Sequence, residues 1–134
     1  MVFGTHVMAK STLPARVREL AILRVGWICR AEYEWGQHVL LAREIGISDD
    51  EIRRLQAGPE AAGWSDVDRA TLRAADQLLR DTHISDDVWD ELSKSFDTEQ
   101  ILDLIFTVGQ YNLVSMALNS LGVQLEPGAP TFQI

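Results

Sequence analysis

The 134-residue sequence has a single cysteine, Cys29, so no disulfide can form within the chain. Basic residues are few: twelve Lys and Arg stand against twenty Asp and Glu, and the formal charge of -8 would repel the phosphates of nucleic acid. Residues 1–12 lack the apolar segment of a signal peptide. These absences favour a cytoplasmic location and argue against nucleic acid as a partner.

Residues 104–125 carry no formal charge, and their number is sufficient for a transmembrane helix. Polar side chains that hydrocarbon would penalise are nevertheless spread through this stretch. They are Gln110, Asn112, Ser115, Asn119, Ser120 and Gln124. We therefore expect no membrane span here, but a buried helix that another subunit partly covers.

The sequence also lacks the sustained period-two alternation of apolar residues that strands of an all-β or α/β domain would show. Hydrophobic residues amount to 46%, which is enough to fill a core, and the chain length is typical of one domain. Helix start and stop signals instead predict a single all-α domain, residues 1–134, of about six helices.

Most of the expected helices are marked by a capping residue. Ser11 or Thr12, followed by Pro14, begins the first helix, which runs to about Cys29, and residues 31–45 form the second. The remaining helices are expected to begin at Ser48, Ser65, Ser85 and Asp97. After the last and longest helix, we expect the segment from Gly122 to be extended and to pack on the helices or on a neighbouring subunit.

Residues 30–38, RAEYEWGQH, concentrate the chemistry. On a helix Glu34 and His38 lie on one face, one turn apart, where a carboxylate and an imidazole can form an acid and base pair. A third group that orients the histidine would improve proton transfer, and Glu19 is the candidate. The alternative is an ordinary surface pair worth a few tenths of a kcal/mol.

The stretch LPARVRELAILRVGWICRAEYEWGQHVLLAREIGIS, residues 13–48, resembles the core of the carboxymuconolactone decarboxylase family, which includes the AhpD alkylhydroperoxidases. The resemblance continues to about Glu126. It implies an AhpD-like helical fold and a homo-oligomer, either a trimer or a hexamer. It also implies a small-molecule substrate.

The peroxidase branch of that family has a glutamate, then a C-x-x-C, then a histidine four residues after the second cysteine. In this sequence the glutamate and histidine fall on Glu19 and His38, whereas the cysteine positions hold Ala31 and Glu34. Disulfide-based peroxide chemistry is therefore disfavoured. Cys29 is rotated about 200° from the first cysteine position on an ideal helix, so we expect it to be buried, inert and directed away from Glu34 and His38.

The decarboxylase branch requires no cysteine pair. The resemblance thus favours a cofactor-free lyase that decarboxylates, or transfers a proton on, a small carboxylated lactone or related acid. His38 would carry the proton, and Glu34 or Glu19 would set its protonation state. Other residues are expected to bind the substrate, with packing as the alternative for the aromatic ones. They are Arg30, Arg24, Tyr33, Trp35, Tyr111 and Asn112.

Two further hypotheses stay open. One is an antioxidant peroxidase that uses Cys29 with an external thiol, and the other is a catalytically silent, oligomeric binding module. No metal is expected, because Glu34 and His38 are the closest ligand pair and transition-metal sites usually need three or more protein ligands. The sequence has no glycine-rich phosphate loop, so no nucleotide cofactor is expected either.

Overall fold

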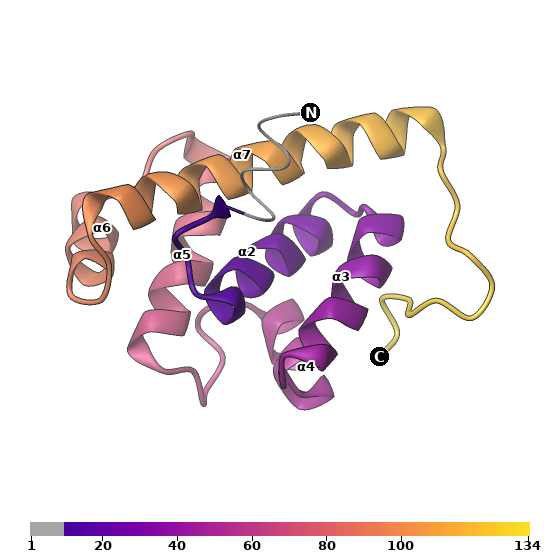
Figure 1. Ribbon diagram of the computed structural model, residues 1–134, viewed down its shortest axis with the longest axis horizontal. Coiled ribbons are helices and arrows are strands. Elements are labelled where there is room, and N and C mark those ends of the chain that lie inside the picture. The colour runs from indigo at the N-terminus through magenta and orange to yellow at the C-terminus, as the bar shows by residue number, and fades with distance from the viewer. Residues whose placement is uncertain (1–9) are drawn as a thin grey trace.

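The computed structural model describes residues 10–134, and within that range it contains six α-helices and no strand, which confirms the predicted all-α class. The helices are α2 (Ala15–Ile28), α3 (Glu32–Glu44), α4 (Asp49–Ala57), α5 (Asp66–Asp81), α6 (Asp86–Ser93) and α7 (Thr98–Leu121). Figure 1 shows α2 in the interior, with α3 and α4 on one side of it, α5 and α6 on the other, and α7 lying across them.

Four of the predicted capping residues begin their helices as expected. The prediction for Ser11 or Thr12 was wrong, because α2 begins at Ala15 with Pro14 at the N-cap and no side chain caps it. Ser48 and Asp97 each form a capping box with the residue three positions later. Ser65 and Ser85 each accept a hydrogen bond from a backbone N–H of the first turn. These local signals fix the ends of α4, α5, α6 and α7 because each satisfies backbone N–H groups that no helical carbonyl reaches.

The hydrophobic core consists of two clusters that share α2. The first joins α2 to α5, α6 and α7 through residues such as Ile22, Leu92 and Leu104. The second joins α2 to α3, α4 and α5, with Trp35 and Leu55 fully buried in it. Because α2 is apolar on most of its circumference, it packs against α3, α4, α5 and α7.

A sharp turn separates α2 from α3. Arg30 adopts a left-handed conformation with φ of 53°, and the N–H of Ala31 donates to the carbonyl of Gly26. The two helices expected here, one to about Cys29 and one over residues 31–45, are thus separated by a bend. The turn folds α3 back against α2, so that residues near the start of one helix face residues near the end of the other.

The C-terminal segment after Gly122 is extended and returns to α3, as expected (Figure 1). Phe132 packs against the rings of Trp27 and Trp35, with ring centroids 5.2 and 5.4 Å apart. The indole N–H of Trp35 donates to the carbonyl of Thr131 at 3.0 Å. A Cβ added to Gly36 would lie 2.6 Å from the carbonyl oxygen of Pro130, so this position needs glycine to let the segment approach.

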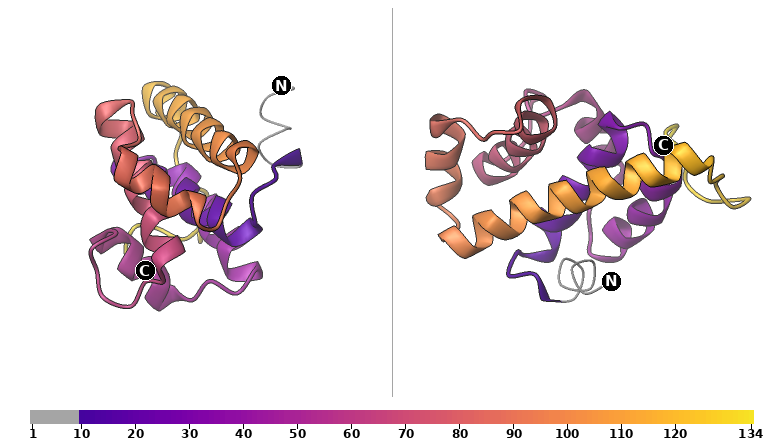
Figure 2. Two further views of the ribbon diagram at one scale, coloured as in Figure 1. Left: turned by 90° about the vertical axis from the view of Figure 1, so that its left-hand side faces the viewer. Right: turned by 90° about the horizontal axis from the view of Figure 1, so that it is seen from above.

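By length and composition α7 could cross a membrane, since it has 24 residues and a mean hydropathy of 1.4 over its most apolar window. In the structure it is instead packed lengthwise over α2 and α5 (Figure 2). Its inner side, which includes Leu104, Val108, Tyr111 and Ser115, is buried against these helices. This packing is that of a helix with one side in the domain core.

Candidate active site

Glu19 on α2 and His38 on α3 form a buried pair. Nδ1 of His38 lies 2.7 Å from Oε2 of Glu19, and the two residues are 6% and 1% exposed. A carboxylate accepts hydrogen bonds but cannot donate them, so Nδ1 is the donor in this contact when Glu19 is in its carboxylate form. Nε2 is then the atom that can exchange a proton with a substrate.

Tyr111 of α7 covers the imidazole from the other side. The rings of His38 and Tyr111 are nearly perpendicular, with their centroids 5.0 Å apart and an interplanar angle of 85°. Burial, together with the charges of Glu34 and Glu19, raises the pKa of the Tyr111 hydroxyl. Tyr111 therefore stays protonated at neutral pH and packs on His38 as a neutral ring.

Glu34 has a different partner. Its Oε2 accepts a hydrogen bond of 2.6 Å from the hydroxyl of Ser115, whereas its Oε1 is buried with no hydrogen-bond partner in the described chain. Burial raises the pKa of Glu34 to about 8, although the Ser115 hydrogen bond acts in the opposite direction. At pH 7 the carboxyl is therefore mostly protonated, so the site contains an acid beside the Glu19–His38 pair.

Glu34 and His38 share a face of α3, as their spacing predicts, but within residues 10–134 they do not hydrogen-bond to each other. The reason is that their partners come from two other helices. Helix α2 supplies Glu19 to the imidazole, and α7 supplies Ser115 to the carboxyl. The structure thus assembles Glu19, Glu34 and His38 in one region, with two separate pairings.

The predicted orientation of Cys29 is wrong. The prediction assumed an uninterrupted helix, whereas α2 ends at Ile28 and the chain turns at Arg30. Cys29 is half-buried, and its Sγ donates to Oδ1 of Asn112 at 3.5 Å. Burial and then the charge of Glu34 raise the pKa of the thiol, while a hydrogen bond with Ser115 lowers it. The thiol consequently lies on the same side as Glu34 and is weakly nucleophilic.

Arg24 and Arg30, which were predicted to bind a substrate carboxylate, lie outside the region that holds Glu19, Glu34 and His38. Arg24 makes a two-pronged ion pair with Asp76, at 2.7 and 3.1 Å, and donates to the carbonyl of Leu55. It therefore ties α2 to α4 and α5. The guanidinium of Arg30 is stacked over the ring of Trp27, 4.3 Å from its centroid, on the exposed turn after α2.

Two of the aromatic residues expected to bind substrate are also elsewhere. Trp35 is fully buried in the core, where it holds the C-terminal segment, so the packing interpretation applies to it. Tyr33 lines a cleft of about 240 Å³ between the start of α3 and the segment after α7. Tyr111 and Asn112, in contrast, lie beside His38 and Cys29 respectively.

Ser115 is the site residue that sequence reasoning missed. It was considered as one of several polar residues that argue against a membrane span. Its position four residues after Tyr111 places both side chains on one face of α7, and that spacing was the available signal. Arg18 is a second residue that the sequence analysis did not identify. Its Nε lies 3.4 Å from Oε1 of Glu19, and because the two residues are adjacent in sequence, helical spacing gave no signal for this contact.

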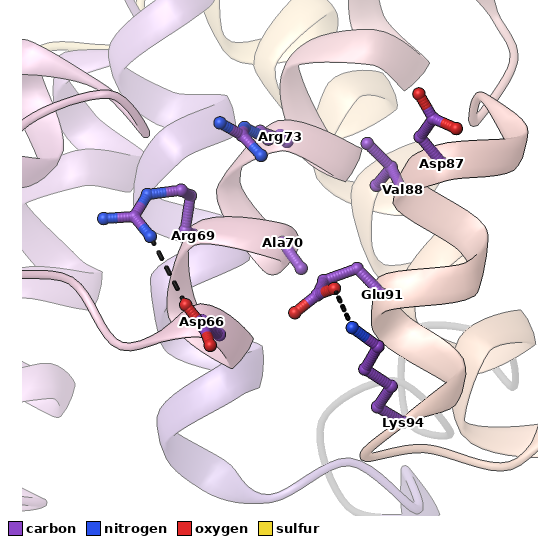
Figure 3. A pocket seen from close by; sticks show the side chains of 8 residues that line it. All are labelled: Asp66, Arg69, Ala70, Arg73, Asp87, Val88, Glu91 and Lys94. Carbon is purple, nitrogen blue, oxygen red and sulfur yellow. Dashed lines mark hydrogen bonds and ion pairs between the residues drawn. The ribbon is translucent and has the colours of Figure 1, made fainter.

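A cleft of about 430 Å³ lies between α5 and α6, away from the Glu19–His38 pair (Figure 3). Its cations already have acidic partners: Arg69 contacts Asp66, and Lys94 contacts Glu91. We therefore assign it no role. In the described part of the chain, no three His, Cys, Asp or Glu residues lie close enough together to hold a metal ion.

Fold and site together define an all-helical protein with a buried carboxylate–histidine pair between two helices. Residues 1–77 match the model of the carboxymuconolactone decarboxylase family, and this match covers more than half of the chain. The chain belongs to that family. It is also similar to the uncharacterised protein YdfG of Bacillus subtilis (strain 168), with 24% identity over 116 residues that cover 83% of this chain and 79% of YdfG.

Two solved structures share the fold. One is a protein of unknown function from Agrobacterium tumefaciens, described as a putative antioxidant defence protein AhpD: the TM-score is 0.85 at 23% identity, over 94% of this chain and 87% of that one. The other is an uncharacterised peroxidase-related protein from Silicibacter sp. TM1040, with a TM-score of 0.84 at 18% identity, over 98% and 71% of the two chains. These similarities confirm the predicted AhpD-like fold.

Proposed function

We propose that the protein is a cofactor-free carboxy-lyase that decarboxylates, or transfers a proton on, a small carboxylated lactone or related acid in the cytoplasm. The observation that carries this proposal is the buried 2.7 Å contact between Glu19 and His38. A carboxylate that fixes one imidazole nitrogen prepares the other nitrogen for proton transfer. Membership of the carboxymuconolactone decarboxylase family supports the reaction class.

In the proposed reaction the bond from the ring carbon to the carboxylate carbon breaks, and CO₂ leaves. The electron pair of that bond moves toward the ring carbonyl as an enolate and then takes a proton at carbon. His38 supplies this proton from Nε2, so one proton is consumed for each CO₂ released. Glu19 stabilises the imidazolium form of His38 by its negative charge.

Glu34 has the second role. With a pKa of about 8 it holds a proton at neutral pH, and its Oε1 has no hydrogen-bond partner in residues 10–134. A neutral carboxyl in this position can donate a hydrogen bond to the carbonyl oxygen on which negative charge develops. Two carboxyl groups thus differ in role: Glu19 acts as an anion and Glu34 as an acid. Tyr111 and Asn112 would line the substrate site.

A thiol peroxidase is the second candidate, because Cys29 lies beside Asn112 and Glu34 and because the two solved neighbours carry antioxidant or peroxidase descriptions. The thiolate would attack the peroxide, giving a sulfenic acid and an alcohol. Two external thiols would then reduce the sulfenic acid, with release of water, because the sequence has no second cysteine. The raised thiol pKa disfavours this route.

The proposal is tested by incubating the protein with carboxylated γ-lactones and related acids in D₂O, measuring CO₂ release and deuterium in the product. We expect both, and we expect them to survive alkylation of Cys29. Peroxide turnover that alkylation abolishes, without CO₂ release, would favour the peroxidase. Ligand binding with neither CO₂ release nor deuterium incorporation would indicate a silent binding module.

A further inference from the structure

Two side chains of α3 meet two side chains of α7 in contacts that are one helical turn apart. Glu34 accepts the hydrogen bond from Ser115, and the ring of His38 packs on the ring of Tyr111. On each helix the two residues are four positions apart, so the contacts repeat with the period of the helix. Helix α7 thus reaches both residues of α3 that the proposed function uses, and Ser115 is its contact with Glu34.

The hydroxyl proton of Ser115 is used outside its own helix. A buried hydroxyl within a helix often donates to the carbonyl four residues earlier, as Thr107 of α7 does to Asp103 at 2.7 Å. Ser115 is as completely buried as Thr107, but its single hydroxyl proton is donated to Oε2 of Glu34 at 2.6 Å. Alanine would favour the helix more than serine does, so the carboxyl, and not the helix, explains a serine here.

This hydrogen bond distinguishes the two oxygens of Glu34. A neutral carboxyl has one oxygen that carries the proton and one that only accepts hydrogen bonds. Because Ser115 donates to Oε2, Oε2 is the accepting oxygen and the proton is on Oε1. Oε1 is buried and has no hydrogen-bond partner within residues 10–134, so no side chain there competes with a substrate for this proton.

We propose that Ser115 is a positioning residue that keeps the proton of neutral Glu34 on Oε1, the oxygen available to a substrate. The inference rests on the proposed function, in which Glu34 donates a hydrogen bond to the carbonyl oxygen that becomes negative. Ser115 acts through Glu34 and touches no reacting atom. By holding Oε2 it prevents the carboxyl from rotating and presenting its accepting oxygen to the developing charge.

The alternative arrangement has the proton on Oε2, which then donates to Ser115. The serine would stabilise the neutral acid in that case, so removing the hydroxyl would lower the pKa of Glu34. In the proposed arrangement the hydroxyl donates to Oε2 and bonds more strongly to the carboxylate than to the neutral acid, so its removal raises the pKa. Burial, the main cause of the raised pKa, remains when one oxygen is removed.

The other titratable groups near Glu34 do not obscure this effect. Burial raises the pKa of both Cys29, after the end of α2, and Tyr111, on α7, so both are neutral at pH 7. A hydrogen bond from Ser115 lowers the pKa of Cys29, so its loss leaves the thiol still more firmly protonated. His38, one turn away on α3, keeps its contact with Glu19.

NMR of protein labelled at the glutamate carboxyl carbons measures the pKa of Glu34 without any substrate, and Glu34→Gln assigns the resonance. We expect a pKa of about 8 in the wild type and a higher value in Ser115→Ala. Thr107→Val is the matched control, because it removes another fully buried hydroxyl from α7, and it should keep the wild-type value. A pKa that falls or stays the same in Ser115→Ala would overturn the proposal.

Steady-state kinetics with a substrate that releases CO₂ tests the catalytic consequence. At pH 7, where Glu34 is mostly protonated in both proteins, we expect kcat to fall at least about 10-fold in Ser115→Ala, because the acid is no longer oriented. Thr107→Val should keep the wild-type kcat, and an unchanged kcat in Ser115→Ala would overturn the role of Ser115. A raised pKa in a protein that releases no CO₂ would contradict the proposed function and support the position of the proton.

Discussion

His38 is held by Glu19, which comes from the preceding helix: the two residues are 19 positions apart in sequence, and their Nδ1 and Oε2 atoms are 2.7 Å apart in the interior. The turn at Arg30 makes this contact possible by folding α3 back on α2. The carboxylate fixes both the orientation of the imidazole and the nitrogen that carries its resident proton.

The first prediction concerns Glu19. Glu19→Gln keeps the size of the side chain but removes the charge that stabilises the imidazolium, so we expect kcat for CO₂ release to fall about 10²-fold with little change in fold. Steady-state kinetics and circular dichroism measure the two effects. Glu44→Gln, an exposed position at the end of α3, is the matched control and should leave kcat unchanged. Equal kcat values for the two variants would contradict the role of Glu19.

The second prediction concerns Glu34 and stability. Its pKa is about 8 in the folded chain, against an ordinary value of 4.5 for glutamate, so the folded chain binds more protons than the unfolded chain between these values. The free energy of unfolding must therefore fall as the pH rises from about 4.5 to 8, with a slope of up to about 1.4 kcal/mol per pH unit from this group.

Urea unfolding at pH 5, 6, 7 and 8 measures this dependence. Glu34→Gln removes the titration while retaining an oxygen that accepts from Ser115, so its stability should decline less steeply than that of the wild type. Glu44→Gln should follow the wild-type curve. Parallel curves for wild type and Glu34→Gln would show that Glu34 titrates normally.

The third prediction concerns the thiol. Cys29→Ser should retain most of the lyase activity, because the proposed proton path runs through His38 and a serine hydroxyl can still donate to Asn112. Wild-type protein should show no thiol-dependent peroxide turnover for the variant to lose, since the thiol pKa is raised and no resolving cysteine is present. A wild-type peroxidase activity that disappears in Cys29→Ser would support the alternative function.

The fourth prediction concerns Gly36. The methyl group of Gly36→Ala would overlap the carbonyl of Pro130 and the side chain of Leu125, so the C-terminal segment must shift. We expect a loss of about 1–3 kcal/mol in the free energy of unfolding and faster proteolysis after Gly122. Gln37→Ala, at the next position, is the control and should show neither effect. Wild-type stability in Gly36→Ala would mean that the segment does not pack here.

The sequence predicted the helices well because their signals are local. Ser48, Ser65, Ser85 and Asp97 cap the helices that they were expected to begin. Each cap depends on residues within one turn of the chain, so no knowledge of tertiary packing is needed to recognise it.

The site was less predictable because its contacts join different helices. Spacing along α3 related Glu34 to His38, whereas the observed partners, Glu19 and Ser115, come from α2 and α7. Glu19 was identified by the family resemblance as well as by its place on the preceding helix, and Ser115 had no such guide. The predicted orientation of Cys29 was wrong because it assumed a continuous helix. The left-handed conformation of Arg30 interrupts that helix.

Chemical rescue of His38→Ala is the most direct test of proton transfer by His38. With a substrate that releases CO₂, we predict that kcat falls at least about 10²-fold in His38→Ala, that added imidazole restores part of it, and that His83→Ala, at an exposed position between α5 and α6, keeps the wild-type value. An unchanged kcat in His38→Ala would contradict the account and leave Glu19 and His38 as a structural pair.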